Sequence, residues 1–241
     1  MKLSKVSILI LSSFALLQTS CIDETDNNFE LQISGFILQE GDGNAKVYTP
    51  YYYFSSNSLD YKLSSVEIMK SGSGDNLLSA VKFSDYIFFA ADTLQLKTPT
   101  ELNGNYYLVG KTTTGLSSQK QLTLEYAETD TLSPIVLDNF AYDGKKISIT
   151  INEVPEAYKI GLILTAFNEG ETPKRYSDAY YTLATMPSWI NGKVSLSMSF
   201  SSEMNLMADY AAVKVFVSNT NSVYRESEAK IMAKDGTNWV K

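Results

Sequence analysis

The sequence predicts an all-β fold, and three observations support this prediction. Apolar and polar residues alternate with a period of two along most of the chain, most clearly in Val194–Phe200, where apolar residues occupy one face and serines the other. Turn-forming dipeptides such as Asn103-Gly104 and Asn191-Gly192 separate these runs, because glycine accepts the positive φ of tight turns. Since no stretch keeps an apolar period of 3.6 residues, we expect at most a short helical turn within Ser202–Ala211.

Each half of the chain contains about seven candidate strands, the number expected for an immunoglobulin-like sandwich. In the first half we expect strands near Phe29–Gln39, Lys46–Phe54, Lys62–Lys70, Ala80–Phe89, Thr93–Thr98, Asn105–Thr112 and Gln119–Tyr126. In the second half we expect them near Pro134–Asn139, Lys146–Glu153, Lys159–Phe167, Arg175–Thr185, Lys193–Phe200, Tyr210–Ser218 and Arg225–Ala233. The sequence therefore predicts two tandem antiparallel immunoglobulin-like β-sandwiches.

A polar segment before Pro134 separates the two halves and predicts a linker over residues 128–133. The predicted domains are then residues 29–127 and 134–241. The two halves also end alike, because each has an apolar strand, a small polar loop and a closing strand of alternating polarity. These endings resemble the final hairpin of immunoglobulin-like and fibronectin type III domains.

The second half carries a further resemblance to fibronectin type III modules. Val154–Ile160 is similar to the turn between the second and third strands of those modules, and the likeness extends over about residues 133–233. The tryptophan usual in the second strand is absent, with Ile149 nearest to its place, and neither half has the cysteine pair of true immunoglobulin domains. The resemblance implies the architecture rather than the family.

The N-terminus has the pattern of an export signal. Lys2 and Lys5 are followed by an apolar stretch over Val6–Leu17. This stretch is shorter than the ~20 residues that a membrane-spanning helix needs, and it matches the apolar core of a secretory signal. Residues 1–20 are therefore predicted to be a signal peptide.

The residues before Cys21 resemble the lipobox of bacterial lipoproteins. Thr19 and Ser20 supply the small residues, and Gln18 replaces the usual leucine, as in the relaxed signals of Bacteroidota lipoproteins. The resemblance implies that Cys21 carries fatty acyl chains, palmitate among them, that hold the protein on the outer membrane. As the only cysteine of the chain, Cys21 has no partner within the chain for a disulfide.

The acidic run after Cys21 predicts a flexible tether over residues 21–28. It also resembles the acidic stretch of surface-exposed Bacteroidota lipoproteins, which implies a location on the cell surface; the periplasmic face stays open as the alternative. Removing residues 1–20 reduces the basic count from 20 to 18 against 27 acidic residues, so the mature chain carries a net charge of −9. Such a chain repels nucleic acid, which is therefore excluded as a partner.

The composition also argues against an enzyme. The chain has no histidine, which excludes Ser-His-Asp and Cys-His catalysis and histidine-bound zinc. We expect no catalytic residues, no cofactor and no metal. Two alternatives stay open: a carboxylate pair, Glu153 with Glu156 or Glu169 with Glu171, and structural calcium, for which Asp42-Gly43-Asn44 is too sparse to match the twelve-residue loop pattern.

Aromatic residues give the strongest hint of binding. The run Tyr51–Phe54 must place two of its four rings away from the core if it is extended, and doublets such as Tyr106-Tyr107 raise the same expectation. We take Tyr51, Tyr53 and Trp189 as candidate ligand contacts. The alternatives are cross-strand aromatic pairing for the tyrosines and a place over the core for Trp189.

These features predict a lipid-anchored binding or assembly module of the cell envelope that acts through protein–protein interaction. The alternative is a surface glycan-binding lipoprotein that accompanies polysaccharide uptake. A hydrolase is the third possibility and lacks the usual catalytic residues. The expected partners are therefore the outer membrane, through the lipid, and a cell-envelope protein or a glycan.

Overall fold

The computed structural model describes residues 28–72, 78–91, 94–143, 146–170, 179–199, 208–235 and 238–240. Within these ranges the protein consists of β-strands with two short 3-10 helices, which confirms the predicted all-β class. The chain divides into two compact units, Met1–Asp130 and Thr131–Lys241. The boundary falls inside the segment 128–133 that the sequence suggests as a linker, and each unit is described by itself.

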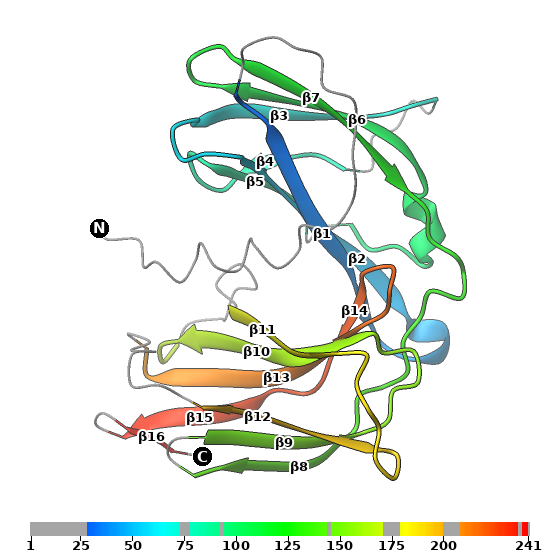
Figure 1. The fold of residues 1–241 in the computed structure, drawn as a ribbon, viewed down its shortest axis with the longest axis vertical. Helices are drawn as coiled ribbons and strands as arrows, with labels where there is room; N and C mark the ends of the chain where they lie inside the picture. The colour runs from blue at the N-terminus through cyan, green and yellow to red at the C-terminus, as the bar shows by residue number, and fades with distance from the viewer. Residues whose placement is uncertain are drawn as a thin grey trace. The chain divides into compact units, whose positions relative to one another are not determined.

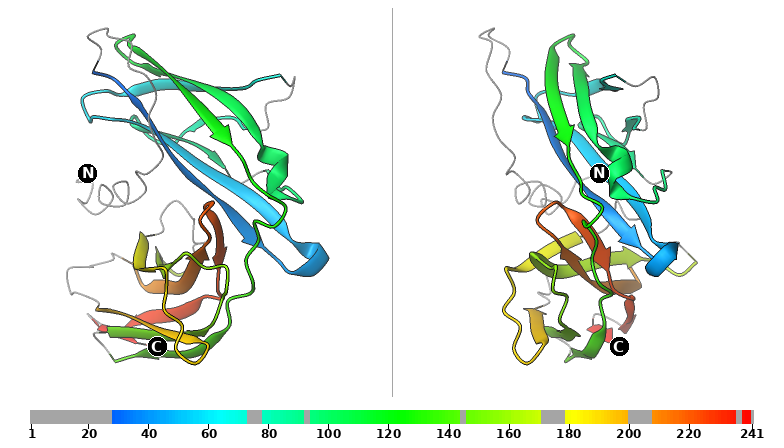
Figure 2. Two further views of the ribbon diagram at one scale, coloured as in Figure 1. Left: turned by 45° about the vertical axis from the view of Figure 1, so that its right-hand side comes forward. Right: turned by 90° about the vertical axis from the view of Figure 1, so that its right-hand side faces the viewer.

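The first unit is a sandwich of two antiparallel sheets (Figures 1 and 2). One sheet has the strand order β1–β2–β5–β4, and the other has the order β3–β6–β7. This is the strand arrangement of a seven-stranded immunoglobulin-like domain. The elements are β1 (Leu31–Glu40), η2 (Gly43–Ala45), β2 (Val47–Ser56), β3 (Leu63–Lys70), β4 (Val81–Lys82), β5 (Ile87–Ala91), η3 (Pro99–Leu102), β6 (Gly104–Thr112) and β7 (Ser117–Leu124).

The core of the first unit lies between the two sheets and follows the period-two pattern of the strands. Tyr52 and Phe54 of β2 are buried, and so are Tyr106 and Leu108 of β6. The two sheets approach closely at Gly110, where an added Cβ would lie 2.8 Å from a methyl carbon of the Leu31 side chain. In β6, and in β2 from Tyr51 to Phe54, every second residue therefore belongs to this core.

Tyr106 fixes the start of β6 from inside the core. Its side chain is fully buried, and its hydroxyl donates a hydrogen bond of 2.8 Å to the carbonyl oxygen of Leu102, in the 3-10 turn that precedes the strand. The Lys70 ammonium lies 5.6 Å from the centre of the Tyr106 ring. A tyrosine at the start of the sixth strand that bonds back to the preceding backbone is the tyrosine corner of immunoglobulin-like sandwiches.

A pair of tyrosines closes the end of the unit at which the chain leaves it. The hydroxyls of Tyr52 and Tyr126 lie 2.8 Å apart. The Asn103 side chain accepts from the Tyr126 N–H at 2.6 Å and donates to the Tyr126 carbonyl at 2.8 Å. Burial raises the pKa of Tyr52 well above its ordinary value of 10.0, with a further contribution from Tyr126, and burial likewise raises the pKa of Tyr126.

These raised pKa values predict alkaline destabilisation of the first unit. Both phenols stay protonated in the folded state at a pH where the unfolded chain releases protons, so the free energy of unfolding falls as the pH rises above about 10. Urea denaturation between pH 8 and 11 should show this loss, and Tyr52→Phe should reduce its slope. An equal slope in the variant would place the alkaline loss elsewhere in the protein.

The second unit is also a sandwich of two antiparallel sheets (Figure 1). The sheet β12–β9–β8 faces a sheet in which β10 pairs with β11 and β13, and β13 pairs in turn with β14 and β15. The two strand orders confirm the predicted pair of tandem sandwiches. The elements are β8 (Leu137–Tyr142), β9 (Lys146–Asn152), β10 (Lys159–Phe167), β11 (Ala179–Thr185), β12 (Lys193–Ser199), β13 (Tyr210–Ser218), β14 (Val223–Glu226), β15 (Lys230–Asp235) and β16 (Asn238–Val240).

Two predicted strands of the first unit differ in the structure. The expected strand Ala80–Phe89 is a hairpin of β4 and β5, because the Phe83 and Ser84 amides both donate to the carbonyl of Ile87 and turn the chain. Thr93–Thr98 contributes a single bridge, Leu96 to Tyr48, and residues 92–93 are outside the described chain. The helical turn expected within Ser202–Ala211 falls mostly on residues 201–207, which are not described either.

The predicted strand Arg225–Ala233 is divided into β14 and β15 by a bulge. Ser227 is buried there, and its hydroxyl accepts the N–H of Val215 at 3.0 Å, while its own N–H donates to the Val215 carbonyl at 2.8 Å. The side chain thus replaces a backbone acceptor where the register shifts. Alternation of apolar residues continues through the segment and gives no sign of this shift.

Candidate functional site

The outer face of the β3–β6–β7 sheet presents a cluster of side chains that the core does not use. We call it the Tyr107 face; its members are Glu67, Met69, Tyr107, Val109, Gln119 and Gln121. Tyr107 and Val109 belong to β6, the central strand of this sheet. Because Tyr106 and Leu108 point into the core, their neighbours in sequence necessarily point outward.

Cross-strand pairing sets the geometry of the Tyr107 face. Tyr107 lies opposite Met69 on one side and opposite Gln121 on the other. In the next row, Val109 lies between Glu67 and Gln119. Residues directly opposite each other in an antiparallel pair have Cβ atoms about 5 Å apart, so each row is a continuous strip of side chains.

The centre of the Tyr107 face is apolar and exposed, and its border is polar. Met69 is 46% exposed and Tyr107 49% exposed, which is high for large apolar side chains. At the border, the Lys111 ammonium forms an ion pair of 3.0 Å with Glu67. Tyrosine and methionine are enriched in protein interfaces, where an apolar centre is commonly ringed by polar groups.

The strand orders of both units are those of immunoglobulin-like sandwiches. Comparison with solved structures finds chains that are similar over most of this one. The chain is similar to the tandem immunoglobulin repeats of Dlar, at 14% identity over 88% of this chain and 98% of that one with a TM-score of 0.38. It is also similar to a chimeric titin Z1Z2 carrying an exogenous decorin peptide, at 11% identity over 83% and 96% of the two chains with a TM-score of 0.27.

A third similar structure is the full ectodomain of mouse nectin-like molecule 4, at 11% identity over 86% of this chain and 63% of that one, with a TM-score of 0.20. No protein-family model matches the sequence, and no curated protein matches it either.

Tyr51 and Tyr53, two candidate contacts from the sequence, lie on the outer face of the other sheet of the first immunoglobulin-like unit. Both are half-buried, whereas Tyr52 and Phe54 between and beyond them are buried. The Tyr51 ring stacks on Phe36 of the neighbouring strand, with ring centres 5.2 Å apart and planes at 22°. This contact is the cross-strand aromatic pairing that the sequence leaves open as an alternative for Tyr51.

Tyr53 belongs to a row of side chains that crosses the same sheet. It lies opposite Phe89 of β5, which in turn lies opposite Val81 of β4. Phe89 makes an edge contact with Phe83, with ring centres 6.0 Å apart. The row becomes more exposed toward the sheet edge, where Val81 is 57% and Phe83 46% exposed.

Trp189, the third candidate contact, is half-buried in the segment that joins β11 to β12. Its neighbours Met186 and Ile190 are each 74% exposed. Asn191 and Gly192 form the tight turn that the sequence indicates, with φ of 51° and 70°, and they pair Ile190 with Lys193. Trp189 belongs to the second unit, whereas Tyr51 and Tyr53 belong to the first.

The remaining candidates have structural surroundings or lie outside the described residues. Cys21 and Glu171 are not described. Glu156 accepts hydrogen bonds from the backbone N–H and the hydroxyl of Ser133, at 3.2 and 3.0 Å. Within the described ranges, no three acidic, histidine or cysteine side chains gather as a metal site would need, and no helix is long and apolar enough to cross a membrane.

Sequence reasoning finds the Tyr107 face only in part. The doublet Tyr106-Tyr107 shows that one ring must leave the core, and the alternation of Val66 and Ile68 with Glu67 and Met69 predicts an outward methionine. The missing information is the pairing of β3 with β6, which puts Met69 beside Tyr107. Residues 38 positions apart meet only through the topology of the sandwich.

Proposed function

We propose that the protein is a lipid-anchored module of the bacterial cell envelope that binds a protein partner through the Tyr107 face. The anchor is Cys21, whose acyl chains hold the mature chain on the outer membrane at the cell surface. The observation that supports partner binding is the exposed pair of Met69 and Tyr107, directly opposite each other at the centre of a sheet face.

The physical reason is the cost of leaving this face in water. Burial of apolar surface contributes roughly 25 cal/mol per Å², and a tyrosine combines a large rigid ring with few lost rotamers on binding. Gln119 and Gln121 supply uncharged donors and acceptors beside the ring, so a partner can satisfy them without desolvating a charge. The acidic character of the mature chain favours a partner with a neutral or basic surface.

Tyr107→Ala should weaken partner binding strongly and leave folding unchanged. A truncated interface hot spot costs at least about 2 kcal/mol, which corresponds to roughly a thirtyfold loss of affinity. A photo-crosslinking amino acid at position 119, in the neighbouring row of the Tyr107 face, should capture the partner when the full-length chain is expressed in its own cells. The affinity of that partner for the Tyr107→Ala variant is then measured.

The control is a crosslinker at Ser195, an exposed residue on the outer face of β12 in the second unit. It should capture nothing specific, and Ser195→Ala should bind the partner with unchanged affinity. Equal capture from both positions would contradict a binding role for the Tyr107 face.

Glycan binding is the second candidate, favoured by the amides that flank the Tyr107 ring. Stacking of a sugar on an aromatic ring with amide hydrogen bonds at its rim suits a Tyr107 ring next to Gln121. A glycan array with the purified full-length chain tests it: binding that Tyr107→Ala and Gln121→Ala both abolish favours the glycan, and an array without binding leaves the protein partner.

Anchoring and location have their own test. Cys21→Ala should release the protein from membranes into the soluble fraction. Protease treatment of intact cells should digest the wild-type protein if it lies on the surface, whereas protection until the outer membrane is opened would contradict surface display and place it in the periplasm.

A further inference from the structure

Four segments meet at the end of the first unit where the described chain begins. Two backbone hydrogen bonds join three of them, from the Leu63 N–H to Asp85 at 2.7 Å and from the Thr113 N–H to Lys62 at 2.8 Å. In Figure 1 this end lies where β1 starts, and the opposite end lies where β7 stops and the chain continues to the second unit. We call it the N-terminal tip; it comprises residues 28–30, 57–62, 83–86 and 113–116.

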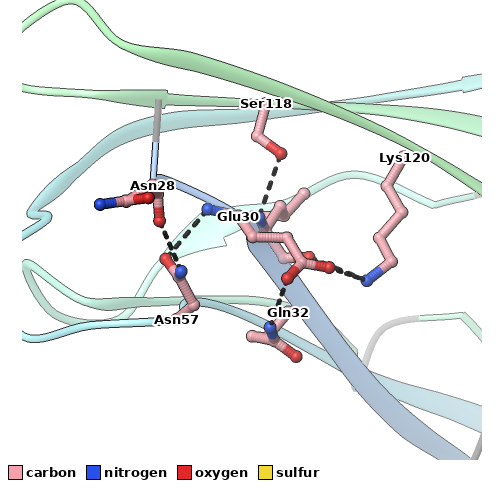
Figure 3. A network of polar contacts seen from close by, with 7 residues as sticks. Asn28, Glu30, Gln32, Asn57, Ser118 and Lys120 are labelled. Atoms are coloured by element: carbon pink, nitrogen blue, oxygen red, sulfur yellow. Dashed lines mark hydrogen bonds and ion pairs between the residues drawn. The ribbon is translucent and has the colours of Figure 1, made fainter. Parts of the chain in front are cut away.

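The first described residues, from Asn28, are fixed on this tip (Figure 3). The Asn57 side chain accepts from the Glu30 N–H at 2.9 Å and donates to the Asn28 carbonyl at 2.6 Å. From the other sheet, the Ser118 hydroxyl accepts the Leu31 N–H at 3.1 Å, and the Lys120 ammonium lies 3.1 Å from Glu30. A chain that arrives at Asn28 is therefore held at the tip by contacts to both sheets.

The tip exposes large apolar side chains. Leu59, in the loop after β2, is 64% exposed, and Phe83, in the turn between β4 and β5, is 46% exposed. Val81 beside that turn is 57% exposed. Exposed apolar side chains on neighbouring loops mark a surface that interacts with a protein or a membrane.

The charges around these residues balance. Lys62 and Lys82 both pair with Asp85, at 3.7 and 3.0 Å, and Asp60 lies in the same loop as Leu59. These two basic and two acidic side chains cancel, and Glu30 is paired with Lys120. The mature chain as a whole is strongly acidic, so the tip is a region where repulsion from an anionic surface is locally absent.

The short segment between Cys21 and the tip indicates that the membrane is the apolar surface next to the tip. Six residues lie between Cys21 and Asn28, and a fully extended chain spans at most about 25 Å over these seven residue steps. An acylated Cys21 lies at the bilayer surface, so the tip is confined to a layer about 25 Å deep next to the lipid. The Tyr107 face, on the side of the sandwich, stays accessible at that distance.

We propose that Leu59 and Phe83 of the N-terminal tip insert into the interfacial layer of the membrane that holds the lipid of Cys21. This inference rests on the proposed lipid anchor. Apolar side chains that enter the boundary between headgroups and acyl chains add to the affinity of the acyl anchor and fix the orientation of the attached domain. The first unit then stands with its N-terminal tip on the bilayer and its opposite end away from it.

The test places an environment-sensitive fluorophore on the full-length, lipidated protein. Leu59→Cys gives one reactive thiol, because Cys21 is the only native cysteine and acylation blocks its sulfur. The labelled protein is inserted into vesicles of phosphatidylethanolamine and phosphatidylglycerol that contain a lipid-borne quencher. Ile190→Cys in the second unit is the matched control, because Ile190 is 74% exposed and Leu59 64% exposed.

We expect a blue-shifted emission at position 59 and quenching at least about threefold stronger than at position 190. Phe83→Asp should reduce the quenching at position 59, because it puts a charge beside the inserted leucine. If each chain carries one probe and the quenching is equally weak at both positions, Cys21 is acylated but the tip does not insert. That result overturns the insertion of the tip and leaves the anchor intact. Two probes per chain show that Cys21 is unacylated, which overturns the anchor and the tip together.

Discussion

Gly161→Ala should destabilise the second unit by about 3 kcal/mol, the upper part of the range for overpacking a dense interior. Gly161 lies in β10 between β11 and β13. A Cβ built at this position would lie 2.6 Å from the Phe216 ring and still closer to the backbone carbonyl oxygen of Tyr181. The carbonyl cannot withdraw without separating β10 from β11, and the buried ring is stacked against Tyr224.

Hydrogen exchange of the full-length protein measures the effect. A loss of about 3 kcal/mol corresponds to roughly a hundredfold faster exchange of the slowest amides in β10 and β13. The matched control is Gly110→Ala, where an added Cβ meets the flexible end of the Leu31 side chain at 2.8 Å and the expected cost is about 1 kcal/mol. The Gly110→Ala effect is read from the slowest amides of β6 in the first unit; an equal acceleration of exchange by each variant in its own unit would show that the second unit has space at Gly161.

Period-two alternation predicts most strands of this protein correctly, because one face of each sheet packs in the core of the sandwich and the other is its outer face. Lys146–Glu153, Lys193–Phe200 and Tyr210–Ser218 are strands in the structure within one residue at each end. The inward residues of β9 and β12 are apolar and their outward residues polar, so a slip by one residue would expose the apolar set of either strand. Strand β13 is mostly buried on both faces, and its strand character comes from its run of apolar residues.

The features that sequence did not predict depend on particular side-chain hydrogen bonds rather than on alternation. Ser227 interrupts the last long strand because its hydroxyl competes for the Val215 N–H, and serine is common on strand surfaces as well. The Tyr106 corner needs the carbonyl of Leu102 to face the ring, which follows from the 3-10 turn rather than from alternation. Pattern alone shows which face a side chain takes, not which strand lies beside it.

The candidate site illustrates the same limit. The run Tyr51–Phe54 is the densest aromatic cluster of the sequence, yet Tyr51 is occupied by its stack on Phe36. Tyr107 is a single outward ring with less signal in the sequence, and its prominence comes from the Met69 side chain that the pairing of β3 and β6 brings opposite it. Aromatic density thus indicates a sheet surface, and strand order decides which part of the surface is free for a partner.

Tyr52→Ala should destabilise the first unit by about 4 kcal/mol, as removal of a large buried ring usually does. The Tyr52 ring covers Gly35 of the neighbouring strand so closely that a Cβ there would lie 2.7 Å from one ring carbon and nearer to another. The same side chain reaches the Tyr126 hydroxyl at 2.8 Å. Its loss therefore opens a cavity over a glycine and removes the partner of a second buried tyrosine.

Two further variants serve as comparisons: one separates the contribution of the Tyr52 ring from that of its hydroxyl, and the other removes a tyrosine from the outer face. Tyr52→Phe keeps the ring and should cost only about 1 kcal/mol, the net contribution of one hydrogen bond. Tyr107→Ala removes the same side chain from the outer face and should change stability by less than about 0.5 kcal/mol. Hydrogen exchange of the amides in β2 and β6 measures the loss of stability in all three variants. We expect the loss to decrease in the order Tyr52→Ala, Tyr52→Phe, Tyr107→Ala. Because Tyr106 and Tyr107 are adjacent and Tyr52 and Tyr53 are too, a small effect of Tyr52→Ala would mean that the two faces of these strands have been assigned the wrong way round.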